Sequence, residues 1–62
     1  MQIIDLAQLM NKVPLGKSTI YAYVKAGKMP APIKVGDRAV GWIESEIDAW
    51  LIERAEASRA TV

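Results

Sequence analysis

The sequence predicts a mainly α-helical domain with one small β-hairpin, in the order helix, turn, helix, hairpin, helix. Two short amphipathic segments, 5–12 and 16–26, stand on either side of a turn that contains proline and glycine. Two prolines and an alternation of apolar and polar residues favour extended chain within 28–42. A third set of apolar residues with helical spacing begins at Ile43.

The composition limits the chain to one small domain, because 62 residues bury only about 60% of their unfolded surface. There is no cysteine and no histidine, which excludes a disulfide and a zinc site with Cys or His ligands. Much of the 52% hydrophobic content is alanine, and the aromatic residues are two tryptophans and two tyrosines. We therefore expect a thin core of Leu, Ile, Val, Met and the tryptophans.

The first helix is expected to begin at Asp5, because an aspartate followed three residues later by Gln8 is a capping-box arrangement. It should end near Lys12, because the residue before Pro14 avoids the helical region. Its apolar face consists of Leu6, Leu9 and Met10.

The second helix is expected to begin at Gly16 or Ser18 and to run to about Ala26. Gly27 stands where a left-handed residue commonly ends a helix. The inward face consists of Ile20, Tyr23 and Val24. Two helices joined by about four residues have the geometry of a helix-turn-helix.

The hairpin is expected to have strands at 33–35 and 39–42 around a turn at 36–38. Two strands are marginal by themselves, so the hairpin must lean on the helices. The third helix should run from about Glu44 to Arg54 or slightly beyond, and its inward stripe consists of Ile43, Ile47, Trp50, Leu51 and Arg54. The whole is a winged helix-turn-helix with a two-stranded wing.

This predicts a domain over residues 1–54 and a frayed C-terminal tail over 55–62. Trp42 and Trp50 are expected in the core rather than on a surface that stacks single-stranded nucleic acid.

The charges are distributed unevenly, although the net charge is only +1. Residues 17–38 carry a local charge of +4, and residues 43–62 carry −3. Such asymmetry produces one basic face. The alternative is an ordinary solvated surface on which charges cluster by chance.

The outward face of the second helix has the composition of a recognition helix. Ser18, Ala22 and Lys25 lie opposite Ile20, and Tyr21 lies at the edge of that face. A small residue lets the helix approach the base edges. A hydroxyl and a lysine can contact bases or phosphates.

The start of that helix combines Lys17, Ser18 and Thr19, where free backbone N–H groups can bind a phosphate. Two alternatives remain open at this stage. The hydroxyls of Ser18 and Thr19 could act only as caps, and Tyr21 could be a core aromatic.

The tip of the hairpin, Gly36 and Asp37, lies between Lys34 and Arg38. An arginine on a narrow turn can enter a minor groove, and a lysine beside it can follow the backbone. The alternative is a hairpin whose charges only discourage pairing with other strands. The candidate DNA-binding residues are Lys17, Ser18, Thr19, Tyr21, Ala22, Lys25, Lys28, Lys34 and Arg38.

Catalysis has little support, because the chain lacks histidine, cysteine and a glycine-rich phosphate loop. Glu44, Glu46 and Asp48 are expected to be solvated acids in the first turns of a helix, where its dipole favours them. We expect no enzyme, no metal, no cofactor and no small-molecule ligand.

The expected partner is double-stranded DNA, bound by two or more copies because a single module covers only roughly 600–1,000 Å². The N-terminal segment has no basic start of a signal peptide, and no apolar run approaches a membrane span of roughly 18 residues. A cytoplasmic, nucleoid-associated protein without a membrane partner is therefore expected.

Several segments together resemble the AlpA-like regulators of phages and prophages, and the resemblance covers about residues 2–54. These segments are Val13-Pro14-Leu15, 17–21, 25–30, 32–38, Gly41-Trp42 and 46–51. The wider group is similar to MerR-type and excisionase-type winged helices. The chain departs from the pattern at Gly16, where serine is common and would cap better, and at Met29, where an aromatic residue is common.

This resemblance implies a sequence-specific DNA binder of a mobile element that controls transcription, often of an integrase or excision function. The contact positions that it implies are Lys17, Ser18, Thr19, Tyr21, Lys25 and Arg38. Two other functions remain open. One is an excisionase-type factor that bends attachment-site DNA, and the other is a protein-interaction module that uses the acidic third helix.

Overall fold

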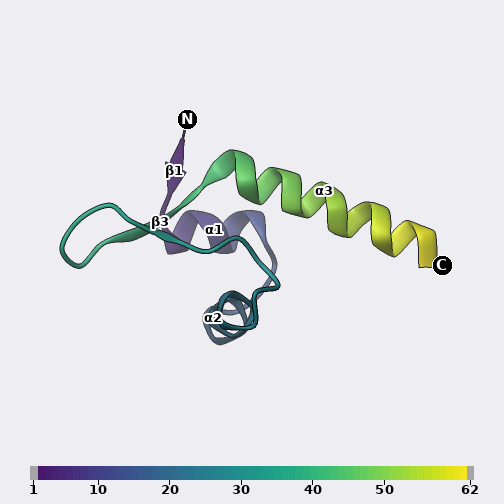
Figure 1. Ribbon diagram of the computed structural model, residues 1–62, viewed down its shortest axis with the longest axis horizontal. Helices are drawn as coiled ribbons and strands as arrows, with labels where there is room; N and C mark the ends of the chain where they lie inside the picture. Colours follow the sequence, from purple (N-terminus) through teal and green to yellow (C-terminus); the bar gives the residue numbers. More distant parts are fainter. Residues whose placement is uncertain (1, 62) are drawn as a thin grey trace.

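Three helices and a small antiparallel sheet make up the computed structural model, which describes residues 2–61 (Figure 1). In chain order the elements are β1 (Ile3–Ile4), α1 (Leu6–Lys12), α2 (Lys17–Lys25), β2 (Ile33–Lys34), β3 (Val40–Ile43) and α3 (Glu44–Thr61). The helix-turn-helix and the hairpin follow in the predicted order. The architecture is therefore that of a winged helix-turn-helix.

The sheet has three strands in the order β1-β3-β2, one more than the predicted hairpin. β2 and β3 form the hairpin, with Ile33 opposite Gly41. β1 pairs with the other edge of β3 and places Ile4 opposite Trp42. β1 was not predicted from the sequence, because two residues are too few to show an alternating pattern.

Gly41 allows β1 to lie close against β3. A Cβ at this position would lie 2.5 Å from Cγ2 of Ile3 and 3.1 Å from the carbonyl oxygen of Ile4. Both distances are shorter than ordinary van der Waals contact. The absence of a side chain at Gly41 thus leaves room for the Ile3 side chain and the Ile4 carbonyl of the neighbouring strand.

α1 begins with the predicted capping box. The carboxylate of Asp5 accepts a 2.8 Å hydrogen bond from the backbone N–H of Gln8, and the side-chain oxygen of Gln8 accepts a 3.0 Å bond from the backbone N–H of Asp5. Leu9 is fully buried, but Met10 is 40% exposed. The prediction from the sequence that Met10 lies on the apolar face of this helix is therefore wrong.

The core lies where α1, α2, α3 and the sheet meet. Its buried side chains are Ile4, Leu9, Val13, Ile20, Met29, Trp42 and Ile47. Trp42 is fully buried, as predicted, whereas Trp50 only packs against this core from the side. Met29, just before Pro30, is one of these buried core residues.

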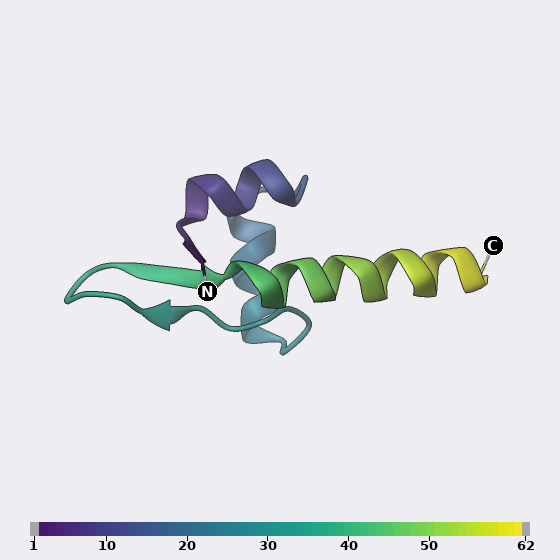
Figure 2. The same ribbon diagram turned by 90° about the horizontal axis from the view of Figure 1, so that it is seen from above.

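α3 continues to Thr61, whereas the sequence predicted an end near Arg54. The apolar stripe does stop there, but Ala, Glu and Arg have high helix propensity and continue the helix without core contacts. Figure 2 shows that α3 and the hairpin extend towards opposite ends of the molecule, which measures 43 × 25 × 19 Å. Among the described residues, no helix is both long and apolar enough to cross a membrane.

Candidate nucleic-acid interface

α2 has one buried side and one open side. Ile20 is fully buried, and Tyr23 and Val24 pack against the core. Figure 1 views α2 nearly end-on, and no other element lies beyond it on the side away from α3. An open helix surface of this kind is what a DNA groove requires of a recognition helix.

All six α2 residues predicted to contact DNA are exposed: Lys17, Ser18, Thr19, Tyr21, Ala22 and Lys25. Tyr21 is 41% exposed, so the alternative that Tyr21 is a core aromatic residue is wrong. The aromatic residue of α2 that packs against the core is Tyr23. The small Ala22 stands among longer side chains on the exposed face.

The N-terminus of α2 is capped by the backbone of Gly16 without a side-chain hydrogen bond. Lys17 is the first helical residue, so Ser18 and Thr19 lie inside the first turn and neither is the N-cap. Both residues are exposed. Their hydroxyls, together with the free backbone N–H groups of this turn, form a polar surface that suits a phosphate.

The C-terminus of α2 ends in the predicted left-handed glycine, since Gly27 has a φ of 74°. The N–H of Gly27 donates to the carbonyl of Val24 at 3.1 Å, and the N–H of Lys28 donates to that of Tyr23 at 2.8 Å. This pair of bonds is a Schellman motif. It fixes the chain beside Lys25, the cation of the last turn.

The hairpin presents Lys34 and Arg38 to solvent. The N–H of Val35 donates to the carbonyl of Ala39 at 3.0 Å and closes the turn between them. Neither cation forms a salt bridge with another described residue. Both charges are therefore available to an external anion.

The acidic start of α3 pairs with α1 instead of forming a site of its own. Nζ of Lys12 lies 2.7 Å from the carboxylate of Asp48 and 3.3 Å from that of Glu44. Hydrogen bonding to Asp48, with a smaller contribution from Glu44, raises the pKa of Lys12 above its ordinary value of 10.5. No group of potential metal ligands occurs within the described part of the chain.

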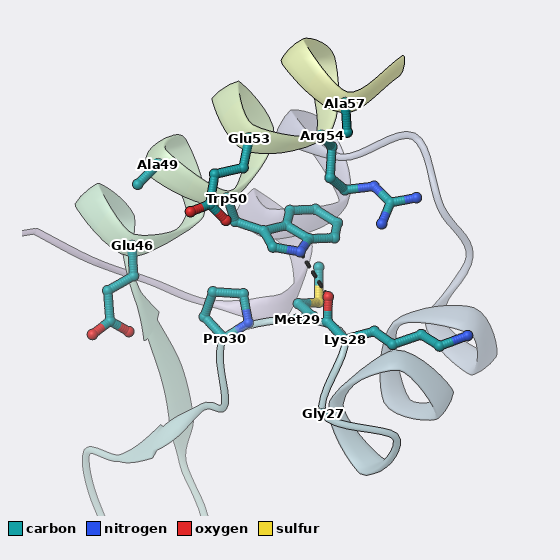
Figure 3. A pocket seen from close by; sticks show the side chains of 10 residues that line it. All are labelled: Gly27, Lys28, Met29, Pro30, Glu46, Ala49, Trp50, Glu53, Arg54 and Ala57. Atoms are coloured by element: carbon teal, nitrogen blue, oxygen red, sulfur yellow. Dashed lines mark hydrogen bonds between the residues drawn. The ribbon is translucent and has the colours of Figure 1, made fainter. Parts of the chain in front are cut away.

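A groove of about 770 Å³ lies between α3 and the segment after α2 (Figure 3). Indole Nε1 of Trp50 donates a 2.7 Å hydrogen bond across it to the carbonyl of Lys28. The guanidinium of Arg54 lies 5.1 Å from the Trp50 ring and 5.6 Å from the Tyr23 ring. Sequence reasoning placed Trp50 in the core and missed this contact, because hydrophobic periodicity cannot show a hydrogen bond between distant segments.

Comparison with known proteins supplies a family and two relatives. Residues 2–55 match the family described as "Prophage CP4-57 regulatory protein (AlpA)". The DNA-binding transcriptional activator AlpA of Escherichia coli (strain K12) is 31% identical over 61 residues, which covers 89% of this chain and 87% of that protein.

The uncharacterized protein ORF88 of Enterobacteria phage P4 is 30% identical over 53 residues. This match covers 86% of the chain but only 60% of the phage protein.

Proposed function

Because this chain belongs to the AlpA family of prophage regulatory proteins, we propose that it is a DNA-binding transcriptional regulator of phage origin that recognises a specific sequence. The observation that carries this proposal is the open face of α2, where Ser18, Ala22 and Lys25 are exposed opposite the fully buried Ile20. The relative from Escherichia coli is named as a DNA-binding transcriptional activator.

In the proposed complex, α2 lies in the major groove. Ala22 allows close approach, and Ser18, Tyr21 and Lys25 contact base edges. Lys25 has the reach and charge to contact guanine O6 and N7 or a phosphate. Lys17 and Thr19, at the start of the helix, bind phosphate together with the free N–H groups of the first turn.

The hairpin contributes a second contact in this proposal. Arg38 and Lys34 lie on the adjacent backbone or in the minor groove, and Lys28 adds a phosphate contact beyond the end of α2. The support is that the side chains of all three residues are exposed and none forms a salt bridge within the described residues. Their main contribution is counterion release, which is independent of sequence and weakens with salt.

The same proposal covers the biological setting. Binding and regulation of DNA require no catalysis, so we propose that the protein is not an enzyme and that it acts on DNA in the cytoplasm. One module of this size buries roughly 600–1,000 Å² of its own surface on DNA. We therefore expect two or more copies to act together on repeated sites.

Affinity selection of random duplex DNA by the purified protein tests the proposal, followed by binding of the selected duplex across a salt series. We expect a defined motif whose affinity falls steeply with salt. Absence of an enriched motif, with only weak binding at low salt, would reject sequence-specific binding and favour a protein-interaction module. If a motif is found, its location at promoters supports transcription control, whereas location at attachment sites supports an excisionase-type role.

A further inference from the structure

The two ends of α2 are held very differently. At its N-terminus Gly16 provides no side-chain cap, and nothing lies within 4 Å of the place where a Cβ would stand. At its C-terminus the Schellman motif of Gly27 and Lys28 satisfies the last carbonyls. A helix of nine residues is marginal by itself. Its direction therefore depends on tertiary contacts, which include the burial of Ile20 in the core and the contact of α3 with Lys28 just beyond its C-terminus.

The backbone of Lys28 joins α2 to α3. Its N–H donates to the carbonyl of Tyr23 in α2, and the carbonyl of Lys28 itself accepts the hydrogen bond from Trp50 in α3. Figure 3 shows the Trp50 ring lying against this segment with its Nε1 directed at the carbonyl. One residue of α3 thus holds the turn that ends the proposed recognition helix.

Arg54 adds to this junction, the set of contacts by which Trp50 of α3 holds Lys28 at the end of α2. Its guanidinium lies within cation–π distance of both Trp50 and Tyr23, one ring from α3 and one from α2. Nζ of Lys28 lies 6.0 Å from the same Tyr23 ring. The Tyr23 ring therefore lies within cation–π distance of a cation from α3 and of one from the turn.

We infer that Trp50 is a positioning residue, which fixes the angle of α2 through the carbonyl of Lys28 without touching DNA. This inference rests on the proposed function of α2. Base contacts require the helix to lie within a fraction of an ångström of the productive geometry, whereas attraction between lysine and phosphate tolerates displacement. The junction therefore controls discrimination between sequences more than total affinity.

Trp50→Phe is the variant that tests this inference, because it keeps an aromatic ring for Arg54 but removes the indole donor. Ile47→Val is the matched control. Ile47 is fully buried on the same helix, and loss of one buried methyl group costs a stability similar to that of one hydrogen bond. Both variants are compared with wild type for binding to the selected duplex and to a random duplex, at equal salt.

For Trp50→Phe we expect affinity for the selected duplex to fall about two- to tenfold, the factor that corresponds to one hydrogen bond. Affinity for the random duplex should stay within about twofold, because it depends on phosphates. Ile47→Val should leave the ratio of the two affinities unchanged. If both variants lower that ratio equally, Trp50 only stabilises the fold and the inference is wrong.

Amide hydrogen exchange tests the junction without DNA. Trp50→Phe should speed exchange at the amides of Ala26, Gly27 and Lys28 relative to Leu9 and Val13 in and after α1, whereas Ile47→Val should not. Equal exchange in the two variants would overturn the inference even if wild type selects a DNA motif. If Trp50→Phe speeds exchange at the end of α2 but wild type selects no DNA motif, Trp50 does hold the end of α2, and the proposed function is rejected.

Arg54→Lys provides a second variant should Trp50→Phe fail to fold. It keeps the positive charge but removes the planar group that stacks on both rings. It should change exchange at the end of α2 in the same direction. Unchanged exchange in this variant would contradict the inference.

Discussion

At the residue scale, Lys25 and Arg38 are exposed cations that form no salt bridge within the described residues. We expect Lys25→Ala to weaken binding to the selected duplex several-fold. A reduction of about 1 in the slope of log affinity against log salt would assign Lys25 to a phosphate, and an unchanged slope would assign it to a base edge. Arg38→Ala should weaken binding by a smaller but measurable factor. Titration of labelled duplex at several salt concentrations measures both effects.

Arg59→Ala is the charge-matched control for these variants. Arg59 is exposed near the end of α3, far along the chain from α2, and its removal changes the net charge by the same amount. It should leave affinity close to that of wild type. If Lys25→Ala binds like Arg59→Ala, α2 does not present its Lys25 face to DNA. If only Arg38→Ala binds DNA like Arg59→Ala, the hairpin has a structural role and does not contact DNA.

Lys12 differs from Lys25 and Arg38, because it forms ion pairs with Glu44 and Asp48 within the fold. Its pKa is raised by Asp48 and Glu44, so the ion pairs stabilise the fold while Lys12 is protonated. This contribution is fully present below the unfolded pKa of 10.5 and is lost as pH rises through the higher folded pKa. The melting temperature of Lys12→Met should therefore lie below that of wild type at pH 7.

The difference between the two melting temperatures should stay constant well below pH 10.5 and narrow at higher pH, as Lys12 loses its proton in wild type. Melting followed by circular dichroism at pH 7, 9 and 11 checks this. Since both proteins share every other titrating group, the comparison isolates Lys12. A difference that stays constant with pH would show that the stem of Lys12, rather than its charge, stabilises the fold.

At the element scale, the pairing of β1 with β3 depends on the missing side chain at Gly41. Gly41→Ala would place a Cβ against Cγ2 of Ile3 and the carbonyl of Ile4. We expect this crowding to lower the free energy of unfolding by about 1–3 kcal/mol, as overpacking of a close contact does. Urea denaturation measures the change.

Ile3→Ala offers a test of the cause, since it removes the Cγ2 that the new methyl group would strike. In a double-mutant cycle, Gly41→Ala should cost less in the Ile3→Ala background than in wild type. Equal costs in the two backgrounds would mean that the carbonyl of Ile4 or the backbone of β3, and not Ile3, opposes a side chain at position 41.

At the scale of the whole molecule, the segment from α2 through the hairpin carries five of the eight basic residues, and α3 carries five of the seven acids. The end of α3 is remote from the core: residues 55–60 include no buried side chain, and the last residue packed against the core is Leu51. We therefore propose that residues 1–54 are the functional domain. A chain that ends after Arg54 keeps the junction of α3 with α2.

This shortened chain should fold cooperatively and bind the selected duplex within about twofold of the full chain, because the phosphate and base contacts are unchanged. Its helical circular dichroism signal should fall with the loss of the last turns of α3. The full chain measured at the same salt is the reference. Loss of folding or of binding in the shortened chain would assign residues 55–62 a part in the domain and contradict the predicted boundary.

The sequence by itself determined the features that depend on neighbouring residues. The Asp5–Gln8 capping box, the end of α2 at Gly27 and the turn between Val35 and Ala39 were all predicted, because capping and turn formation are decided within a few residues. The helical spacing around Ile20 likewise separated the buried side of α2 from its exposed face. The order of these elements and the family resemblance followed from the same local patterns.

Only the tertiary structure decided how distant segments meet. It added β1, whose Ile4 pairs with Trp42, and it joined Lys12 to Asp48 and Trp50 to the carbonyl of Lys28. It also placed Tyr21 outside the core. None of these contacts leaves a periodic pattern in the chain, because each depends on the three-dimensional packing that brings residues far apart in sequence within bonding distance.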